Sequence, residues 1–149
     1  MTVEKGRPRA VLFVCAFNSV RSPMAAALLR QMAPEGLSVA CAGVRKDTLD
    51  PFAVAAMAET GIDIASHEPT TIDELEDLEG LDFDLIVTLS PEAHHTALAL
   101  THRLPAKVEY WPTADPTATE GNREQRLDAY RMVRDQLAAR IKARFFPAA

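Results

Sequence analysis

Apolar runs and amphipathic segments alternate along the chain. Ala10 to Cys15 is a continuous apolar run, and Leu85 to Leu89 is a second, almost entirely apolar one; such runs are typical of strands covered on both faces. Weaker strand candidates, Leu37 to Cys41 and Lys107 to Trp111, follow at similar intervals. Because helical stretches separate these strands, the pattern predicts an α/β fold in three layers, with a parallel sheet, helices on both of its faces and right-handed crossovers.

Capping signals mark where the predicted helices begin. Three of them begin with a Ser or Asp that can bond to free amide groups, followed by a proline that gives up no hydrogen bond in the first turn. These pairs are Ser22-Pro23, Asp50-Pro51 and Ser90-Pro91. A fourth start, Thr71 with Glu74, matches a capping box, and the last helix starts near Asn122. The apolar periodicity of that last helix places Arg134 among its solvent-facing residues.

Length and composition fit one compact domain. The chain has 149 residues, 48% of them hydrophobic and 25% charged, so we expect a single domain over residues 1–149 with a frayed N-terminus at residues 1–8. The longest apolar run, Ala10 to Phe17, is too short to span a bilayer and lacks a signal-peptide cleavage site. The net charge of -5 argues against nucleic-acid binding. We therefore expect a cytoplasmic protein, monomeric or weakly dimeric, that binds neither nucleic acid nor membrane.

A cysteine and an arginine bound the loop that follows the first strand. This 15–21 loop reads Cys15-Ala16-Phe17-Asn18-Ser19-Val20-Arg21 and is followed by the helix start Ser22-Pro23. A short loop between a strand and a helix N-terminus turns several backbone N–H groups inward, and these form a site for an anion of phosphate size. The helix end and Arg21 favour the thiolate form of Cys15, which is the reactive nucleophile. The pattern therefore predicts Cys15 and Arg21 as catalytic residues.

The other residues of the 15–21 loop are predicted to bind the substrate anion, together with Ser22. They are Ala16, Phe17, Asn18, Ser19 and Val20. Asn18 tolerates a left-handed backbone, Arg21 can hold two oxygens of an oxyanion with its planar guanidinium, and Ser22 can donate to the thiolate or cap the helix. The alternative is that Cys15 is a small buried hydrophobe and Arg21 a solvated residue of the first turn. The strand-to-helix context favours the anion site.

The departing oxygen of a phosphate ester needs a proton, so the hypothesis calls for a carboxylic acid on another strand-end loop. The best candidate is Asp115, which follows the last strand candidate and is stiffened by Pro116. The alternative is an ordinary Asp-Pro turn. Asp115 is thus the third predicted catalytic residue.

Three histidines, His94, His95 and His102, lie in or near one predicted helix. No cysteine or tight carboxylate cluster joins them, so they do not indicate a metal site. We expect them to face solvent, and we expect the protein to use no metal and no organic cofactor.

The segment Val11 to Pro23 resembles the phosphate loop of the low-molecular-weight protein-tyrosine phosphatases and of the arsenate reductases that share their fold. The matching residues are Cys15, Asn18, Arg21, Ser22 and Pro23. Further matches cover nearly the whole chain: Cys41-Ala42-Gly43, Gly61-Ile62-Asp63-Ile64 followed by His67, Asp84 to Thr88, and Asp115-Pro116. The resemblance implies a four-stranded parallel sheet in the order 2-1-3-4, and it implies a hydrogen-bonding role for His67 in a loop.

The same resemblance implies a mechanism in two steps. Cys15 attacks phosphorus in line while Arg21 and the loop amides hold the equatorial oxygens and Asp115 protonates the leaving group. Asp115 then activates the water that hydrolyses the phosphocysteine. The implied substrate is a phosphorylated protein or a small phosphomonoester, or arsenate in the reductase branch.

Departures from the family pattern bear on the choice between these branches. Phe17 stands where the phosphatases typically carry glycine, so a positive φ at this position would strain the loop. Thr117 and Ala118 replace the aromatic residues that typically follow Asp-Pro in the tyrosine phosphatases. The tail resembles the reductase branch, yet Thr88 to Glu92 lacks the further cysteines through which thioredoxin-coupled reductases pass electrons.

Cys41 is the only other thiol in the chain. It either bridges to Cys15 from a neighbouring strand or, as we prefer, fills the space of a serine that would brace Asn18. Three functions stay open. The first is a cysteine-dependent phosphatase acting on protein phosphotyrosine or small aryl phosphates, the second an arsenate reductase that uses an external thiol donor, and the third a phosphoanion-binding module without turnover.

Overall fold

The computed structural model describes residues 8–33 and 35–147. Within them, four strands form one parallel sheet in the order β2-β1-β3-β4. The strands are β1 (Ala10–Cys15), β2 (Ser38–Gly43), β3 (Leu85–Thr88) and β4 (Lys107–Tyr110). The predicted fold class and strand order are confirmed. The expected frayed N-terminus, residues 1–8, lies outside the described residues except for residue 8.

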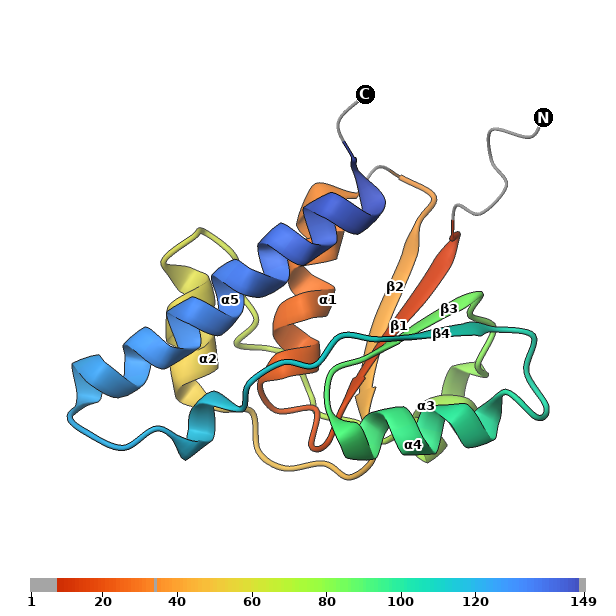
Figure 1. The fold of residues 1–149 in the computed structure, drawn as a ribbon, viewed down its shortest axis with the longest axis horizontal. Helices are drawn as coiled ribbons and strands as arrows, with labels where there is room; N and C mark the ends of the chain where they lie inside the picture. The colour runs from red at the N-terminus through yellow and green to blue at the C-terminus, as the bar shows by residue number, and fades with distance from the viewer. Residues whose placement is uncertain (1–7, 34, 148–149) are drawn as a thin grey trace.

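Helices cover both faces of the sheet (Figure 1). On one face lie α1 (Arg21–Met32), α2 (Pro51–Ala58) and α5 (Arg123–Phe145). On the other lie α3 (Ile72–Glu79) and α4 (Pro91–Leu100). A short 3-10 helix, η2 (Pro116–Ala118), precedes α5. None of the helices in the described part of the chain has the length and apolar character needed to cross a membrane.

Strand β1 contributes to two hydrophobic clusters because its side chains alternate between the faces of the sheet. Val11, Phe13 and Cys15 belong to the cluster that includes α1 and α5, whereas Leu12 and Val14 belong to the cluster that includes α4. All five are buried, and full burial of a Val, Leu or Phe side chain stabilises the fold by about 1.5–3 kcal/mol. The continuous apolar run therefore reflects a strand with no solvent face, and its last residue is the thiol.

Capping hydrogen bonds confirm four of the predicted helix starts. The capping side chains are Asp50 for α2, Thr71 for α3, Ser90 for α4 and Asn122 for α5. The prediction that Ser22 caps a helix is wrong, because α1 begins one residue earlier and its N-cap residue, Val20, makes no side-chain capping bond. Ser22 is the second residue of α1, and its hydroxyl bonds to Cys15 Sγ instead.

Arg134 is buried, which corrects the prediction that it faces solvent. Its guanidinium donates to the carbonyl oxygen of Ala56 at 2.7 Å and to Glu59 Oε1 at 3.0 Å. Arg131 donates to Glu59 Oε2 at 2.7 Å. These bonds join the C-terminal end of α2 to α5. Helical periodicity could not reveal them, since Arg134 lies 75 residues from Glu59 in the sequence.

Candidate active site

The 15–21 loop turns its carbonyl groups outward, toward the segment 44–50. Backbone N–H groups of that segment donate to the carbonyl oxygens of Cys15 (3.1 Å), Ala16 (2.8 Å), Phe17 (3.2 Å) and Ser19 (3.1 Å). A peptide N–H points away from the carbonyl of the same peptide group, so the loop amides are aimed at the opposite, inner side. Loop amides arranged in this way at a helix start are the kind of donors that bind anions in proteins.

Two residues make this loop conformation possible. Gly43 lies against the loop, because a Cβ placed on it would come within 2.8 Å of the backbone nitrogen of Asn18. Asn18 has a φ of 54° and is the one non-glycine residue of the described ranges with a positive φ. The left-handed position is therefore one residue later than Phe17, on a side chain that tolerates it. The strain considered for Phe17 does not arise.

The thiol of Cys15 is buried beneath the loop and has two hydrogen-bond partners. Its Sγ lies 2.9 Å from Ser22 Oγ and 3.3 Å from the backbone nitrogen of Asn18. The Ser22 oxygen also accepts a bond from Asn18 Nδ2 at 2.8 Å, so its own proton can go to the sulfur at 2.9 Å or to the Ala42 carbonyl oxygen at 3.4 Å. A hydroxyl and an amide N–H directed at sulfur both stabilise a thiolate.

Asn18 is fully buried, and His67 and Thr70 hold its side-chain oxygen. The His67 Nε2 atom lies 3.0 Å from Asn18 Oδ1, and the Thr70 backbone N–H donates to the same oxygen at 2.9 Å. Burial, and then the nearby Arg30, hold the pKa of His67 below its ordinary value of 6.5. His67 is thus a neutral donor that fixes a loop residue, the hydrogen-bonding role implied by the resemblance.

Cys41 is a buried thiol whose position on β2 is offset by two residues from the partner of Cys15. Its Sγ is 3.9 Å from His67 Nε2, and burial raises the pKa of its thiol to about 11. In the parallel register Cys41 pairs with Phe13, while Cys15 pairs with Gly43. A diagonal offset of two residues between neighbouring strands separates the Cα atoms by about 8 Å. A disulfide between the two cysteines would therefore require backbone movement, and the space-filling interpretation of Cys41 is favoured.

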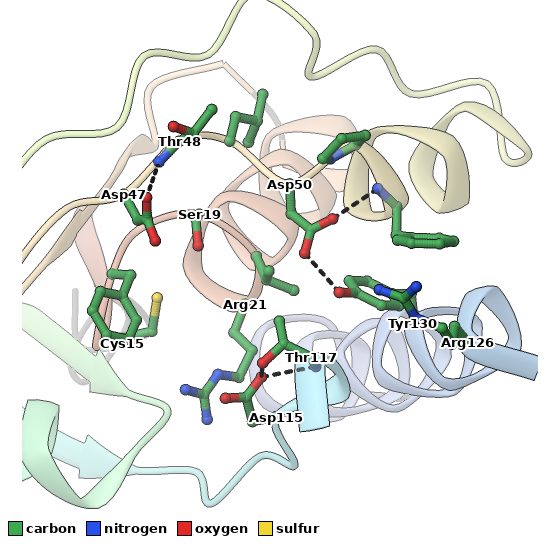
Figure 2. Close-up of a pocket in the computed structure, with 15 residues that line it drawn as sticks. Cys15, Ser19, Arg21, Asp47, Thr48, Asp50, Asp115, Thr117, Arg126 and Tyr130 are labelled. Atoms are coloured by element: carbon green, nitrogen blue, oxygen red, sulfur yellow. Dashed lines mark hydrogen bonds between the residues drawn. The ribbon is translucent and has the colours of Figure 1, made fainter. Parts of the chain in front are cut away.

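Cys15, Arg21 and Asp115 line one cleft of about 560 Å³ at the carboxyl end of the sheet. Figure 2 shows the three side chains on its wall. The guanidinium of Arg21 donates to the carbonyl oxygen of Thr113 at 2.9 Å, which ties it to the loop that carries Asp115. Asp115 caps η2 by accepting a bond from the Thr117 backbone N–H at 3.0 Å. The cleft thus combines a thiol, a guanidinium and a carboxyl group.

A family model described as "Low molecular weight phosphotyrosine protein phosphatase" matches residues 10–144 of this sequence. The chain belongs to this family. The matched range contains the whole of the 15–21 loop as well as Asp115, so the family assignment covers each element of the cleft described above. The resemblance to this family that the sequence indicated, including the strand order, is therefore confirmed.

The proteins that this chain is similar to, in sequence or in fold, carry different activities in their names. An arsenate reductase from Shouchella clausii (strain KSM-K16) is 36% identical over 135 residues, which cover 90% of this chain and 93% of the relative. The solved structure of the tyrosine phosphatase amsI from Erwinia amylovora superposes with a TM-score of 0.74 at 21% identity and covers 94% of this chain and 93% of its own. The YwlE arginine phosphatase from Geobacillus stearothermophilus has a TM-score of 0.69 at 25% identity, with coverages of 91% and 89%. Membership shows an enzyme family that includes both phosphatases and arsenate reductases, and the reaction has to be argued from the site.

The cleft of this family member contains only part of the predicted anion-binding set. Phe17, Ser19 and Val20 line it, whereas Ala16, Asn18 and Ser22 do not and are buried. Other lining residues were not predicted as site residues: Asp47, Thr48, Leu49, Asp50, Pro51, Phe52, Thr117, Arg126 and Tyr130. The Tyr130 hydroxyl donates to Asp50 Oδ2 at 2.6 Å, an interaction drawn in Figure 2, and burial followed by Asp50 raises the pKa of the phenol. The apolar periodicity of α5 predicts Tyr130 as a core residue and gives no sign that it also lines the cleft.

The three histidines do not behave alike in this phosphatase-family fold. His95 and His102 are exposed, as predicted, but His94 is half-buried. Its Nδ1 atom lies 3.0 Å from Thr88 Oγ1, and its ring stacks on Tyr110 with 4.6 Å between centroids. The amphipathic helix could not show this, because Thr88 and Tyr110 belong to neighbouring strands. Among the described residues, no group of three or more His, Cys, Asp or Glu side chains is arranged to hold a metal ion.

Proposed function

We propose that this chain is a phosphatase that hydrolyses phosphomonoesters, either phosphotyrosine in proteins or small aryl phosphates, through a phosphocysteine intermediate. The supporting observation is that Asp115 shares one cleft with Cys15 and Arg21. Hydrolysis needs an acid for the leaving oxygen and a base for water, and a single carboxyl group can serve both steps in turn. Reduction of arsenate needs thiols instead.

In the first step, the Cys15 thiolate attacks phosphorus in line with the leaving oxygen. The P–O bond breaks as the S–P bond forms, and Asp115 passes its proton to the departing oxygen. Arg21 and the inward amides of the 15–21 loop hold the equatorial oxygens, whose charge increases in the transition state. In the second step Asp115 takes a proton from water, the water oxygen bonds to phosphorus, and the S–P bond breaks. Ser22 Oγ, 2.9 Å from the sulfur, stabilises the departing thiolate.

Arsenate reduction is the second candidate, because the curated relatives include arsenate reductases at 36% identity. The chain contains two cysteines in all. The two cysteines lie on paired strands at positions offset by two residues, so a disulfide between them would require the backbone to move. A reductase built on this chain would therefore need an external thiol to resolve an oxidised Cys15. This requirement and the presence of Asp115 in the cleft support the phosphatase proposal over the reductase.

The deciding experiment compares para-nitrophenyl phosphate hydrolysis at mildly acidic pH with arsenate reduction supported by glutathione or by a thioredoxin system. We expect hydrolysis by the wild type, none by Cys15→Ser, and a rate lowered by about 10²–10⁴-fold in Asp115→Asn. Cys41→Ser is the matched thiol replacement and should retain turnover. Hydrolysis that persists in Cys15→Ser would falsify the proposal. Thiol oxidation that depends on arsenate, without hydrolysis, would favour the reductase, and phosphate binding without either reaction would favour a binding module.

A further inference from the structure

Phe17 is a large apolar residue that the fold leaves exposed beside the nucleophile. It is 41% exposed. The large exposed hydrophobic residues of the described ranges are Phe17, Leu78, Leu98 and Met132. Of these, Phe17 alone lines the cleft that contains Cys15. A phenyl ring gains free energy when it is removed from water, so a bound apolar group that covers Phe17 would be stabilised.

The ring of Phe17 is held in place rather than free to turn away. The Arg45 guanidinium lies over it, 5.1 Å from the ring centroid. Glu92 holds that guanidinium in turn through two bonds, the longer of which is 2.6 Å. The backbone N–H of Arg45 also donates to the carbonyl oxygen of Ala16 at 2.8 Å. Phe17 is therefore a preorganised surface, and binding against it loses little conformational entropy.

Phe52 is the second phenyl ring of the cleft, and other side chains already pack against it. Phe52 stacks on Tyr130 with 5.3 Å between centroids, and the Arg126 guanidinium lies 4.7 Å from its ring centroid. Phe17 has one such neighbour, Arg45, among the described residues. In the same cleft, the residue that follows Asp115-Pro116 is the small, polar Thr117. The cleft therefore offers one available aromatic surface, and it belongs to the 15–21 loop itself.

We propose that Phe17 forms the wall of a leaving-group subsite that selects planar, aromatic leaving groups. This proposal rests on the proposed phosphatase function and names the part of the substrate that Phe17 would recognise. A ring attached to the phosphate oxygen would pack against Phe17 in an offset or edge-to-face arrangement, which adds affinity beyond the buried area. Phe17 acts here on specificity and takes no part in bond making.

The test measures binding rather than turnover, so that its result does not depend on the reaction. Inorganic phosphate, methylphosphonate and phenylphosphonate are titrated by calorimetry into Cys15→Ser and into Cys15→Ser combined with Phe17→Ala. We expect Phe17→Ala to weaken the binding of phenylphosphonate about tenfold more than it weakens the binding of inorganic phosphate or of methylphosphonate. Phe17→Tyr in the same background keeps a ring at this position and should keep the preference for phenylphosphonate.

The possible outcomes separate the subsite from the phosphatase function. Equal weakening of all three ligands would show that Phe17 supports the loop and not a leaving group, and an unchanged affinity for phenylphosphonate would show that the ring contributes nothing. Either result overturns the subsite. If the preference depends on Phe17 while the wild type hydrolyses no aryl phosphate, the subsite stands and the phosphatase proposal fails. Absence of binding of any of the three anions would overturn both.

Discussion

Thr117 holds the candidate acid in one orientation. Its hydroxyl donates to Asp115 Oδ1 at 2.6 Å, and its backbone N–H donates to the same oxygen at 3.0 Å. Both bonds use Oδ1, so Oδ2 is the oxygen left to exchange a proton with a leaving group or with water. Asp115 is exposed, and an exposed carboxyl group without such bonds would rotate freely between conformers. Thr117 is therefore a positioning residue for Asp115.

Thr117→Val removes the hydroxyl while keeping the size of the side chain and the backbone N–H. Loss of one neutral hydrogen bond lowers the population of the productive conformer, so we expect kcat for an aryl phosphate to fall by about two- to tenfold. KM should change little, because Thr117 is not expected to hold the phosphate. Thr117→Ser keeps the hydroxyl and should restore kcat. Equal losses in the two variants, or a loss confined to KM, would contradict this role.

At the scale of elements, the α2–α5 contact forms one side of the cleft. Asp50, which caps α2, accepts a bond from Tyr130 on α5 at 2.6 Å. At the other end of α2, Glu59 bonds to Arg131 and Arg134 of α5. A carboxylate at the C-terminal end of a helix is unfavourable by itself, because the last carbonyl groups carry partial negative charge. The two arginines compensate for it.

These arginines give the α2–α5 contact a defined dependence on pH. Bonds to Arg131, and then to Arg134, lower the pKa of Glu59 from 4.5 to about 2. Between these two values the unfolded chain binds the proton more readily than the folded protein does. The contribution of Glu59 to stability is therefore present above about pH 4.5 and is lost as the pH falls toward 2.

Glu59→Gln should lower the urea midpoint of unfolding at pH 7, and the difference from the wild type should shrink between pH 4.5 and about 2. Glu124→Gln is the matched control. Glu124 also bonds to Arg131, at 2.6 Å, but lies on the same helix, so its loss leaves α2 and α5 joined. We expect the smaller effect from this variant. Equal midpoints for the two variants at pH 7 would show that the bridge between helices adds nothing.

The structural features that were predicted correctly are those that a short stretch of consecutive residues indicates. The apolar run of β1, the proline starts of α2 and α4 and the capping box of α3 each occupy a few consecutive residues, and each is confirmed. Cys15 and Asp115 were predicted to meet because parallel strands bring their ends to one edge, and they line one cleft. The missed features depend on distant partners. Tyr130 reaches Asp50 across 80 residues of sequence, and the buried Arg134 reaches Glu59 across 75.

On the scale of the whole molecule, an acidic protein has to attract an anion locally. The net charge is -5, and three carboxylates, Asp47, Asp50 and Asp115, line the cleft against two guanidinium groups, those of Arg21 and Arg126. Long-range electrostatics therefore do not favour phosphate at this site, and screening by salt further weakens whatever acts beyond about 8–10 Å. Affinity has to come from donors at contact distance. On the proposed function these donors are Arg21 and the N–H groups of the 15–21 loop, whose carbonyl groups accept bonds from the segment 44–50.

Inorganic phosphate should accordingly stabilise the folded protein through this site. A ligand at one hundred times its dissociation constant adds about 2.7 kcal/mol, which for a chain of this length raises Tm by about 5–10 °C. Arg21→Lys keeps the charge but loses the planar fork, so its Tm should rise much less on addition of phosphate. The readout is the shift on adding phosphate, because Arg21 also bonds to Thr113 and its loss lowers the starting Tm. Sodium chloride at matched ionic strength controls for screening. A shift of the same size in Arg21→Lys, or an equal response to chloride, would place the stabilising phosphate elsewhere on the molecule.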